Sequence, residues 1–294
     1  MTNKCLTLAL HGGAGAVPQR DYDGELAHMK GLVEAARDRL RAGASALDVA
    51  VETVEALEAS GLYVAGRGAS PNTAGRYELD ASLMDGPSRK AGSVAALEGF
   101  RSPIRAARAV METTPHVMLA GAGAAELARK AGLAEIGDPE AWFTRAHRTT
   151  PKPTRSSLSH GTVGCVVCDG EGRLAAATST GGVFGKLWGR VGDAPIPGAG
   201  TWADDVVAVS CTGLGEYFIR TAAAAQVAFR MRFGGQDLAT AAQGVLDEIK
   251  ALGGDGGLIA LTPDGRIAMP YNSQGMKRAS LDADGNIVSA VFRD

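Results

Sequence analysis

The sequence has no long hydrophobic run and no marked excess of charge of either sign. Near its amino end the longest apolar stretch is Cys5 to Leu10, which is too short to span a membrane or to form the core of a signal peptide. The formal net charge of −2 over 294 residues provides no basic surface for nucleic acid or anionic lipid. We therefore expect a cytoplasmic protein that binds neither nucleic acid nor membrane.

Cysteine is scarce, with four residues in the chain. Cys165 and Cys168 form a C-x-x-C pair, a spacing found at redox and zinc sites. In a strand, however, residues three apart point to opposite faces, and no second Cys or His pair has ligand spacing. The sequence therefore predicts buried thiols and no metal ion held by side chains.

Apolar residues are plentiful, at 45%, and their spacing predicts an α+β protein. Helical periodicity indicates helices over 25–41, 45–59, 103–111, 121–131 and 236–252, and a further helix that ends at Arg232. Short apolar runs indicate strands over 77–84, 92–97, 163–168, 174–177, 206–210, 257–261, 267–270 and 287–292. Strands in two blocks with helix pairs between them favour two stacked sheets with helices outside, a four-layer αββα sandwich.

Two of these strands flank the glycine-rich turn at 169–172 and are typical of a β-hairpin. The hairpin brings Thr162, at the start of its first strand, beside the hydroxyls and glycines at the end of its second. A simple four-residue turn pairs Thr162 with Ser179, whereas a bulge or a one-residue slip pairs it with Thr180. The pattern alone leaves both pairings open.

A threonine hydroxyl is a poor nucleophile unless a base takes its proton, and the α-amine of an N-terminal threonine can be that base. Its unperturbed pKa is about 8, which is close to working pH. For Thr162 this requires cleavage of the Gly161–Thr162 bond, and glycine at 161 tolerates a strained peptide. The preceding segment, 136–160, is poor in apolar residues and is predicted to be a flexible linker.

A second glycine-rich stretch, His11 to Ala16, follows the apolar run near the amino end. Its glycine spacing does not match a dinucleotide-binding fingerprint, and Pro18 interrupts the helix that such a fingerprint needs. We interpret the stretch as a tight turn beside a site and expect no binding of NAD.

Three short sequence motifs together resemble the plant-type L-asparaginase/isoaspartyl aminopeptidase family. Members of this family are N-terminal-nucleophile hydrolases that cut themselves before a threonine. The motifs are Gly-Thr-Val-Gly-Cys-Val-Val at 161–167, Ala-Ala-Ala-Thr-Ser-Thr-Gly-Gly at 175–182 and Leu-Asp-Ala-Ser-Leu-Met-Asp-Gly at 79–86. The resemblance extends from His11 to about Arg220. It implies the αββα fold, a single domain over 1–294 cut into 1–161 and 162–294, and a dimer of the resulting heterodimers.

The resemblance also implies roles for individual residues. Thr162 is the nucleophile, Thr180 tunes it by a hydrogen bond, and the turn after the strand at 206–210 supplies the oxyanion hole at Thr212 and Gly213. Arg190 and Asp193 would form a surface ion pair of little energetic value in an ordinary protein. Here they fall on the family's arginine and aspartate, which hold an α-carboxylate and an α-ammonium. Gly12 and Gly215 complete the implied substrate-binding set.

One position departs from the family pattern. Members usually carry an asparagine that holds the substrate directly before the Ala65-Gly66 pair, and this sequence has Val64. Arg67 and Asn72 are the candidates to replace that amide. Members also bind a sodium ion through main-chain carbonyls of the preceding loop, which here correspond to Glu58, Gly61, Tyr63 and Gly66.

The resemblance predicts hydrolysis of the side-chain amide of L-asparagine and of β-aspartyl dipeptides, without a cofactor. A glycosylasparaginase uses the same chemistry, but Gly161 replaces the aspartate expected before its nucleophile. Val64 keeps open a member specialised for another β-aspartyl or γ-linked amide. A third alternative is an uncleaved, inactive binding module of the same fold.

Overall fold

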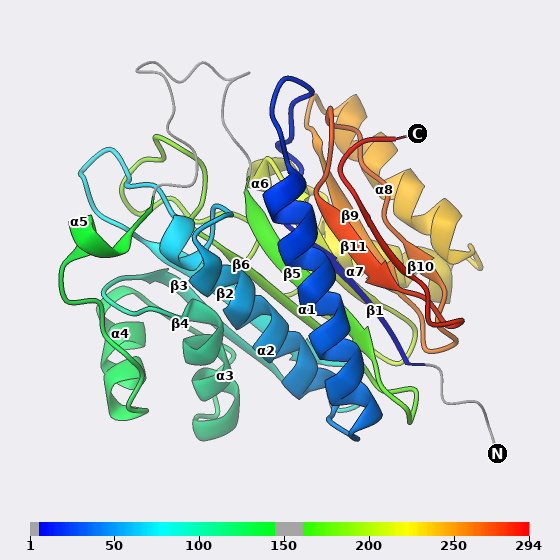
Figure 1. The fold of residues 1–294 in the computed structure, drawn as a ribbon, viewed down its shortest axis with the longest axis horizontal. Coiled ribbons are helices and arrows are strands. Elements are labelled where there is room, and N and C mark those ends of the chain that lie inside the picture. Colours follow the sequence, from blue (N-terminus) through cyan, green and yellow to red (C-terminus); the bar gives the residue numbers. More distant parts are fainter. Residues whose placement is uncertain (1–5, 145–160, 294) are drawn as a thin grey trace.

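The computed structural model describes residues 6–144 and 161–293 and has two β-sheets stacked between two layers of helices (Figure 1). The larger sheet has eight strands in the order β12-β11-β1-β5-β6-β2-β3-β4, and the smaller has four in the order β10-β9-β8-β7. The expected four-layer αββα sandwich is confirmed. Among the described residues, no helix combines the length and hydrophobicity needed to cross a membrane.

The longer helices of the described residues lie outside the sheets, and the short elements η1 and α5 belong to connecting loops. They are α1 (Asp23–Arg41), α2 (Ala46–Ser60), the 3-10 turn η1 (Gly66–Gly68), α3 (Pro103–Thr113), α4 (Gly121–Lys130), α5 (Pro139–Trp142), α6 (Gly215–Arg220), α7 (Ala223–Arg232) and α8 (Leu238–Ala251). The strands are β1 (Thr7–His11), β2 (Leu79–Asp85), β3 (Ala91–Leu97), β4 (Met118–Ala120), β5 (Thr162–Cys168), β6 (Leu174–Thr180), β7 (Thr201–Ala203), β8 (Ala208–Gly213), β9 (Gly256–Leu261), β10 (Ile267–Ala268), β11 (Arg278–Leu281) and β12 (Ile287–Ala290).

Three hydrophobic clusters fill the spaces between the four layers. One joins α1–α4 to the outer face of the large sheet, one joins α6–α8 to the outer face of the small sheet, and one lies between the sheets. Cys165 belongs to the first cluster and Cys168 to the third, so the two side chains point to opposite faces of β5. Cys165, Cys168 and Cys211 are buried, as predicted, and Cys5 lies outside the described residues.

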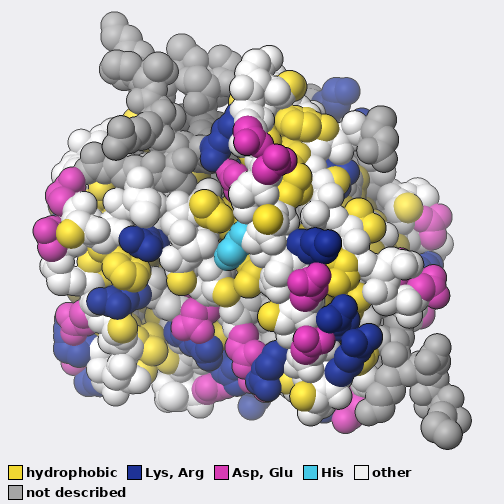
Figure 2. Space-filling model, viewed as in Figure 1, with side chains coloured by type: hydrophobic (Ala, Val, Ile, Leu, Met, Phe, Trp, Pro, Cys, Tyr) yellow, Lys and Arg dark blue, Asp and Glu magenta, His cyan; other side chains and the backbone are white. Residues whose placement is uncertain are grey.

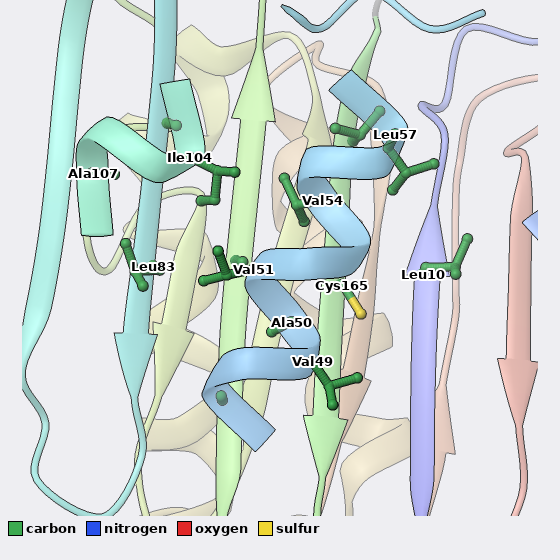
Figure 3. Close-up of a cluster of buried hydrophobic side chains, with 14 of the residues drawn as sticks. Leu10, Val49, Ala50, Val51, Val54, Leu57, Leu83, Ile104, Ala107 and Cys165 are labelled. Carbon is green, nitrogen blue, oxygen red and sulfur yellow. The ribbon is translucent and has the colours of Figure 1, made fainter. Parts of the chain in front are cut away.

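Helix α2 packs on β5 and β6 at the centre of the large sheet (Figure 3). Its N-terminus is capped by Ser45, whose hydroxyl accepts a hydrogen bond from the Asp48 amide. Gly61 ends it in the left-handed conformation at φ 72°. The side chains of Val54 and Leu57 belong to the buried cluster between α2 and the large sheet, whose strand β5 begins at Thr162 (Figure 3).

Two features of the small sheet and its helices differ from the sequence-based prediction. The single helix expected to end at Arg232 is two helices, because Ala222 adopts a left-handed conformation with φ 47° between α6 and α7. The pattern also missed β7 of this sheet, together with β4 and β11 of the large sheet, and each of these strands has only three or four residues. Strands that short carry too few alternations to be recognised from periodicity.

The surface of one face of the molecule mixes charges of both signs (Figure 2). Acidic and basic side chains are interspersed there without a broad patch of either sign, in keeping with the near-zero net charge. This face therefore has no electrostatic footprint typical of nucleic-acid binding.

Candidate active site

The β5–β6 hairpin resolves which residue lies opposite Thr162. The strands are joined by five residues, Asp169–Arg173, rather than the four that the sequence suggested. Arg173 joins the turn because its amide and guanidinium both bind the Asp169 carboxylate. The extra residue shifts the register by one without a bulge, and Thr162 pairs with Thr180.

The hydroxyls of Thr162 and Thr180 meet at the junction between Gly161 and Thr162. Thr162 Oγ1 donates to Thr180 Oγ1 at 3.3 Å, and Thr180 Oγ1 donates to the Gly161 carbonyl at 2.9 Å. The Gly182 amide donates to the same Thr180 oxygen at 2.9 Å. Thr180 therefore contacts both the hydroxyl of the predicted nucleophile and the carbonyl that self-cleavage would attack.

Val64 packs directly on Gly161. A Cβ added at Gly161 would lie 2.3 Å from Val64 Cβ, so only glycine fits before Thr162. The Val64 carbonyl also accepts a hydrogen bond from the Gly181 amide at 2.8 Å, which ties it to the end of β6. At this position the chain therefore offers a hydrocarbon surface where the family usually has an amide.

Neither candidate for the missing amide is directed at Thr162. Arg67 Nε donates to the Trp142 carbonyl at 3.2 Å, and its guanidinium lies over the Trp142 ring. The Asn72 amide donates to Glu78 at 2.7 Å, and its oxygen accepts from the amides of Ala74 and Arg76. Both side chains hold neighbouring loops in place, so the suggestion that one of them replaces the asparagine has no support in the geometry.

Arg190 and Asp193 lie close enough to interact electrostatically. Glu216 is a third charged member of this group, and the sequence analysis did not identify it. Arg190 Nε and Nη2 bind the two carboxylate oxygens of Glu216 at 2.9 and 3.0 Å. Its Nη1 lies against Gly192, where an added Cβ would be 2.7 Å away. Glu216 follows the expected glycine turn and offered no motif of its own. It holds one edge of the guanidinium and leaves the Nη1–Nη2 end for a ligand.

Asp193 is 3% exposed, and its Oδ2 has no hydrogen-bond partner among the described residues. A Cβ at Gly215 would lie 2.8 Å from Asp193 Oδ1, so glycine at the start of α6 lets the loop and helix meet. Burial raises the pKa of Asp193 to about 7, against the opposing attraction of Arg190. A buried carboxylate with an unused oxygen is suited to receive an ammonium group.

This pKa predicts a pH-dependent step in substrate recognition. A group with a raised pKa is ionised only above it, so kcat/KM for a substrate with an α-ammonium should rise as pH increases through about 7. Asp193→Asn should lower kcat/KM and remove this limb, leaving any limb that belongs to the Thr162 amine. Steady-state assays across roughly pH 5–9 measure both effects. Identical pH profiles for the two proteins would contradict the role of Asp193.

Thr212 and Gly213 end β8, the strand of the small sheet that faces β5. Thr212 Oγ1 accepts a hydrogen bond from the Ala14 amide at 3.3 Å, which joins β8 to the glycine-rich turn after β1. Because strand residues alternate, Thr212 shares the inner face of β8 with Ser210. Thr212 therefore faces the large sheet, and Gly213 follows it as the last residue of β8.

Gly12 has a packing reason to be glycine. A Cβ there would lie 2.5 Å from the Tyr63 ring, and its amide donates to the Lys277 carbonyl at 2.8 Å. That donor is therefore already used within the fold. Any contact of Gly12 with a substrate would have to use its carbonyl.

The carbonyls expected to bind sodium belong to a loop that folds back on α2. Gly66, at φ 50°, lies so close that an added Cβ would be 2.7 Å from the Glu58 carbonyl. The carbonyls of Gly61, Tyr63 and Gly66 each accept one hydrogen bond and keep a second lone pair. Main-chain oxygens of this kind are the ligands that hard cations prefer. No cluster of three or more metal-ligating side chains occurs within 6–144 and 161–293.

The sequence is similar to known proteins over nearly its whole length. The family model described as asparaginase matches residues 4–290. The chain is 45% identical to an isoaspartyl peptidase of Salmonella typhimurium, covering 98% of each protein. It is 43% identical to an isoaspartyl peptidase of Escherichia coli, over 98% of this chain and 96% of that protein. A plant-type L-asparaginase of Pyrobaculum calidifontis is 41% identical over 92% of this chain and 95% of its own.

Proposed function

The chain belongs to the asparaginase family, and we propose that it is a threonine amidohydrolase that activates itself by cutting its own backbone. It then hydrolyses the side-chain amide of L-asparagine and of β-aspartyl dipeptides and releases L-aspartate. The observation that carries this proposal is the contact of Thr180 Oγ1 with both Thr162 Oγ1 and the Gly161 carbonyl.

Self-cleavage begins when Thr162 Oγ1 attacks the Gly161 carbonyl carbon. The C–N bond to Thr162 breaks, the hydroxyl proton goes to the departing nitrogen, and an ester links Gly161 to the Thr162 side chain. Water then hydrolyses the ester and gives a Gly161 carboxylate and a free Thr162 hydroxyl. The hydrogen bond from Thr180 polarises the carbonyl during the attack. The new α-amine of Thr162 becomes the base for turnover.

Turnover repeats this chemistry on a substrate. Thr162 Oγ1 attacks the side-chain carbonyl, its proton passes through the α-amine to the leaving amine, and Thr212 and Gly213 stabilise the oxyanion. Arg190 binds the substrate α-carboxylate and Asp193 its α-ammonium. Water then releases L-aspartate from the acyl-enzyme. Ordinary α-peptides are rejected because their aspartyl α-carboxylate is consumed in the peptide bond.

The proposal also covers the subunit assembly and a bound sodium ion. Residues 1–161 and 162–294 form the two subunits of one domain, and two such heterodimers associate. A sodium ion bound by the carbonyls of Glu58, Gly61, Tyr63 and Gly66 fastens the loop that carries Val64. The expected linker at 136–160 falls largely outside the described residues, which end at 144 and resume at 161.

Purified protein tests the proposal directly. A denaturing gel should give two bands, and the smaller fragment should begin Thr-Val-Gly-Cys-Val. Ammonia release from L-asparagine and amino-acid release from β-aspartyl dipeptides should both be detected, with α-aspartyl dipeptides as the matched negative substrates. A single band without hydrolysis would favour the inactive binding module. Two bands with activity only on another β-aspartyl or γ-linked amide would indicate altered specificity.

A further inference from the structure

A continuous series of buried hydrogen bonds begins at the main chain of Thr162 and runs between the two sheets. His11 Nδ1 lies 3.1 Å from the Thr162 carbonyl oxygen, and His11 Nε2 lies 3.0 Å from Ser210 Oγ. Ser210 Oγ in turn lies 2.7 Å from Thr178 Oγ1. The series thus crosses from the large sheet to β8 and back to β6.

The other end of the series reaches the loop that carries Asp193. Thr178 Oγ1 lies 2.6 Å from Thr201 Oγ1, which lies 2.7 Å from Ser82 Oγ. Ser82 Oγ also lies 2.6 Å from the carbonyl oxygen of Ala194, the residue after Asp193. We call this series of hydrogen bonds the relay. Its five side chains are fully buried: His11, Ser82, Thr178, Thr201 and Ser210.

The direction of each hydrogen bond follows from the Thr162 carbonyl, which can only accept. His11 must therefore carry its proton on Nδ1, and because burial lowers its pKa to about 3 it is neutral, with Nε2 as an acceptor. Ser210 then donates to His11, and each hydroxyl further along donates to the one before it. Ser82 Oγ has one proton and two acceptors, Thr201 Oγ1 and the Ala194 carbonyl oxygen, so the two acceptors share this proton.

The main chain explains why a side chain is needed beside Thr162. The β1–β5 ladder ends at the pair His11–Gly164, and β1 then turns away into the glycine-rich stretch. Thr162 lies two residues beyond this point, and within the described part of the chain it pairs with β6 alone. The His11 side chain takes the place of the missing strand as a hydrogen-bond donor.

We propose that His11, Ser210, Thr178, Thr201 and Ser82 are positioning residues that hold the nucleophile Thr162 and the Asp193 loop in one fixed register. The His11 end acts on Thr162 and therefore on self-cleavage and turnover. The Ser82 end acts on the Asp193 loop and therefore on substrate binding. The proposal rests on the proposed function, because it assigns Thr162 as the nucleophile.

Paired substitutions in the relay test the proposal. Thr178→Val keeps the shape and removes the hydroxyl, which bonds both Ser210 and Thr201. It should slow self-cleavage and lower kcat/KM by about tenfold or more each, as expected when buried hydrogen bonds are lost. Thr178→Ser keeps the hydroxyl and should recover both. Thr7→Val is the matched control, because Thr7 is equally buried on β1 and its hydroxyl has no partner among the described residues. It should leave both rates within about twofold.

The two ends of the relay should give different kinetic effects, which a purely structural role would not produce. Ser82→Ala leaves the donors toward His11 intact, so it should raise KM several-fold at an unchanged rate of self-cleavage. Ser210→Ala should slow self-cleavage, because His11 Nε2 loses its donor. Self-cleavage is followed on denaturing gels after cell-free synthesis. KM is measured in steady-state assays with L-asparagine. Equal effects of Thr178→Val and Thr7→Val would overturn the proposal.

Histidine NMR supplies a measurement that does not depend on activity. In the wild-type protein labelled with ¹⁵N-histidine, His11 should be neutral with its proton on Nδ1 at pH 7, and Ser210→Ala should disturb that signal. A wild-type His11 with its proton on Nε2 would refute the relay even if the enzyme is fully active. An inactive, uncut wild-type protein with the Nδ1 proton in place would instead refute the proposed function.

Discussion

Thr162→Ala is expected to leave one intact 294-residue chain that has lost amidase activity by about 10³-fold or more. The substitution removes the only atom that the proposed mechanism uses to attack either Gly161 or a substrate. Thr162→Ser keeps the hydroxyl and should still process, more slowly, because a serine rotates more freely than a β-branched threonine. Intact mass spectrometry and ammonia release measure the two effects.

Ser179→Ala is the matched control for this prediction. Ser179 is the neighbouring hydroxyl that a four-residue turn would have placed opposite Thr162, but in the structure it pairs with Val163. Since adjacent strand residues face opposite sides, its loss should leave cleavage and turnover within a few-fold of the wild type. Efficient cleavage by Thr162→Ala, or a chain left uncut by Ser179→Ala, would transfer the role of nucleophile away from Thr162.

The sequence predicted the layers of this fold because their signals are local. Helix α2 has a capping serine, a glycine stop and a regular apolar face, and its predicted bounds differ from those in the structure by one residue at each end. The hairpin around 169–173 could also be predicted, but not its register. That register depends on Arg173 binding Asp169, a contact between side chains that no periodicity records.

The candidate site was predicted less completely for the same reason. Thr162 and Thr180 occur in recognisable strings, and the structure brings their hydroxyls together. Glu216 and His11 each bind a residue that is distant in sequence: Glu216 binds Arg190, and His11 binds the Thr162 carbonyl. Val64 could be recognised as a departure, but only the packing on Gly161 explains what it does. Such contacts are set by tertiary structure, which the order of residues does not reveal directly.

Arg190→Ala should lower kcat/KM for L-asparagine roughly 10²- to 10³-fold, which is typical when one partner of a buried charge pair is removed. Self-cleavage should continue, because the uncut chain presents no free α-carboxylate to Arg190. Arg190→Lys should recover only part of the activity, since an ammonium cannot bind Glu216 and a substrate through a planar fork. Gel analysis and steady-state kinetics separate the two steps.

A modified substrate isolates the contact itself. L-asparaginamide, whose α-carboxylate is replaced by an amide, should be a poor substrate for the wild-type enzyme and should lose little further activity with Arg190→Ala. This non-additivity is expected only if the guanidinium and the α-carboxylate interact directly, because independent effects would multiply. Equal losses for both substrates would mean that Arg190 acts through Glu216 and the loop around Asp193 instead. In the expected case, the Nη1–Nη2 edge that Glu216 leaves open is what restricts the enzyme to substrates with a free α-carboxylate.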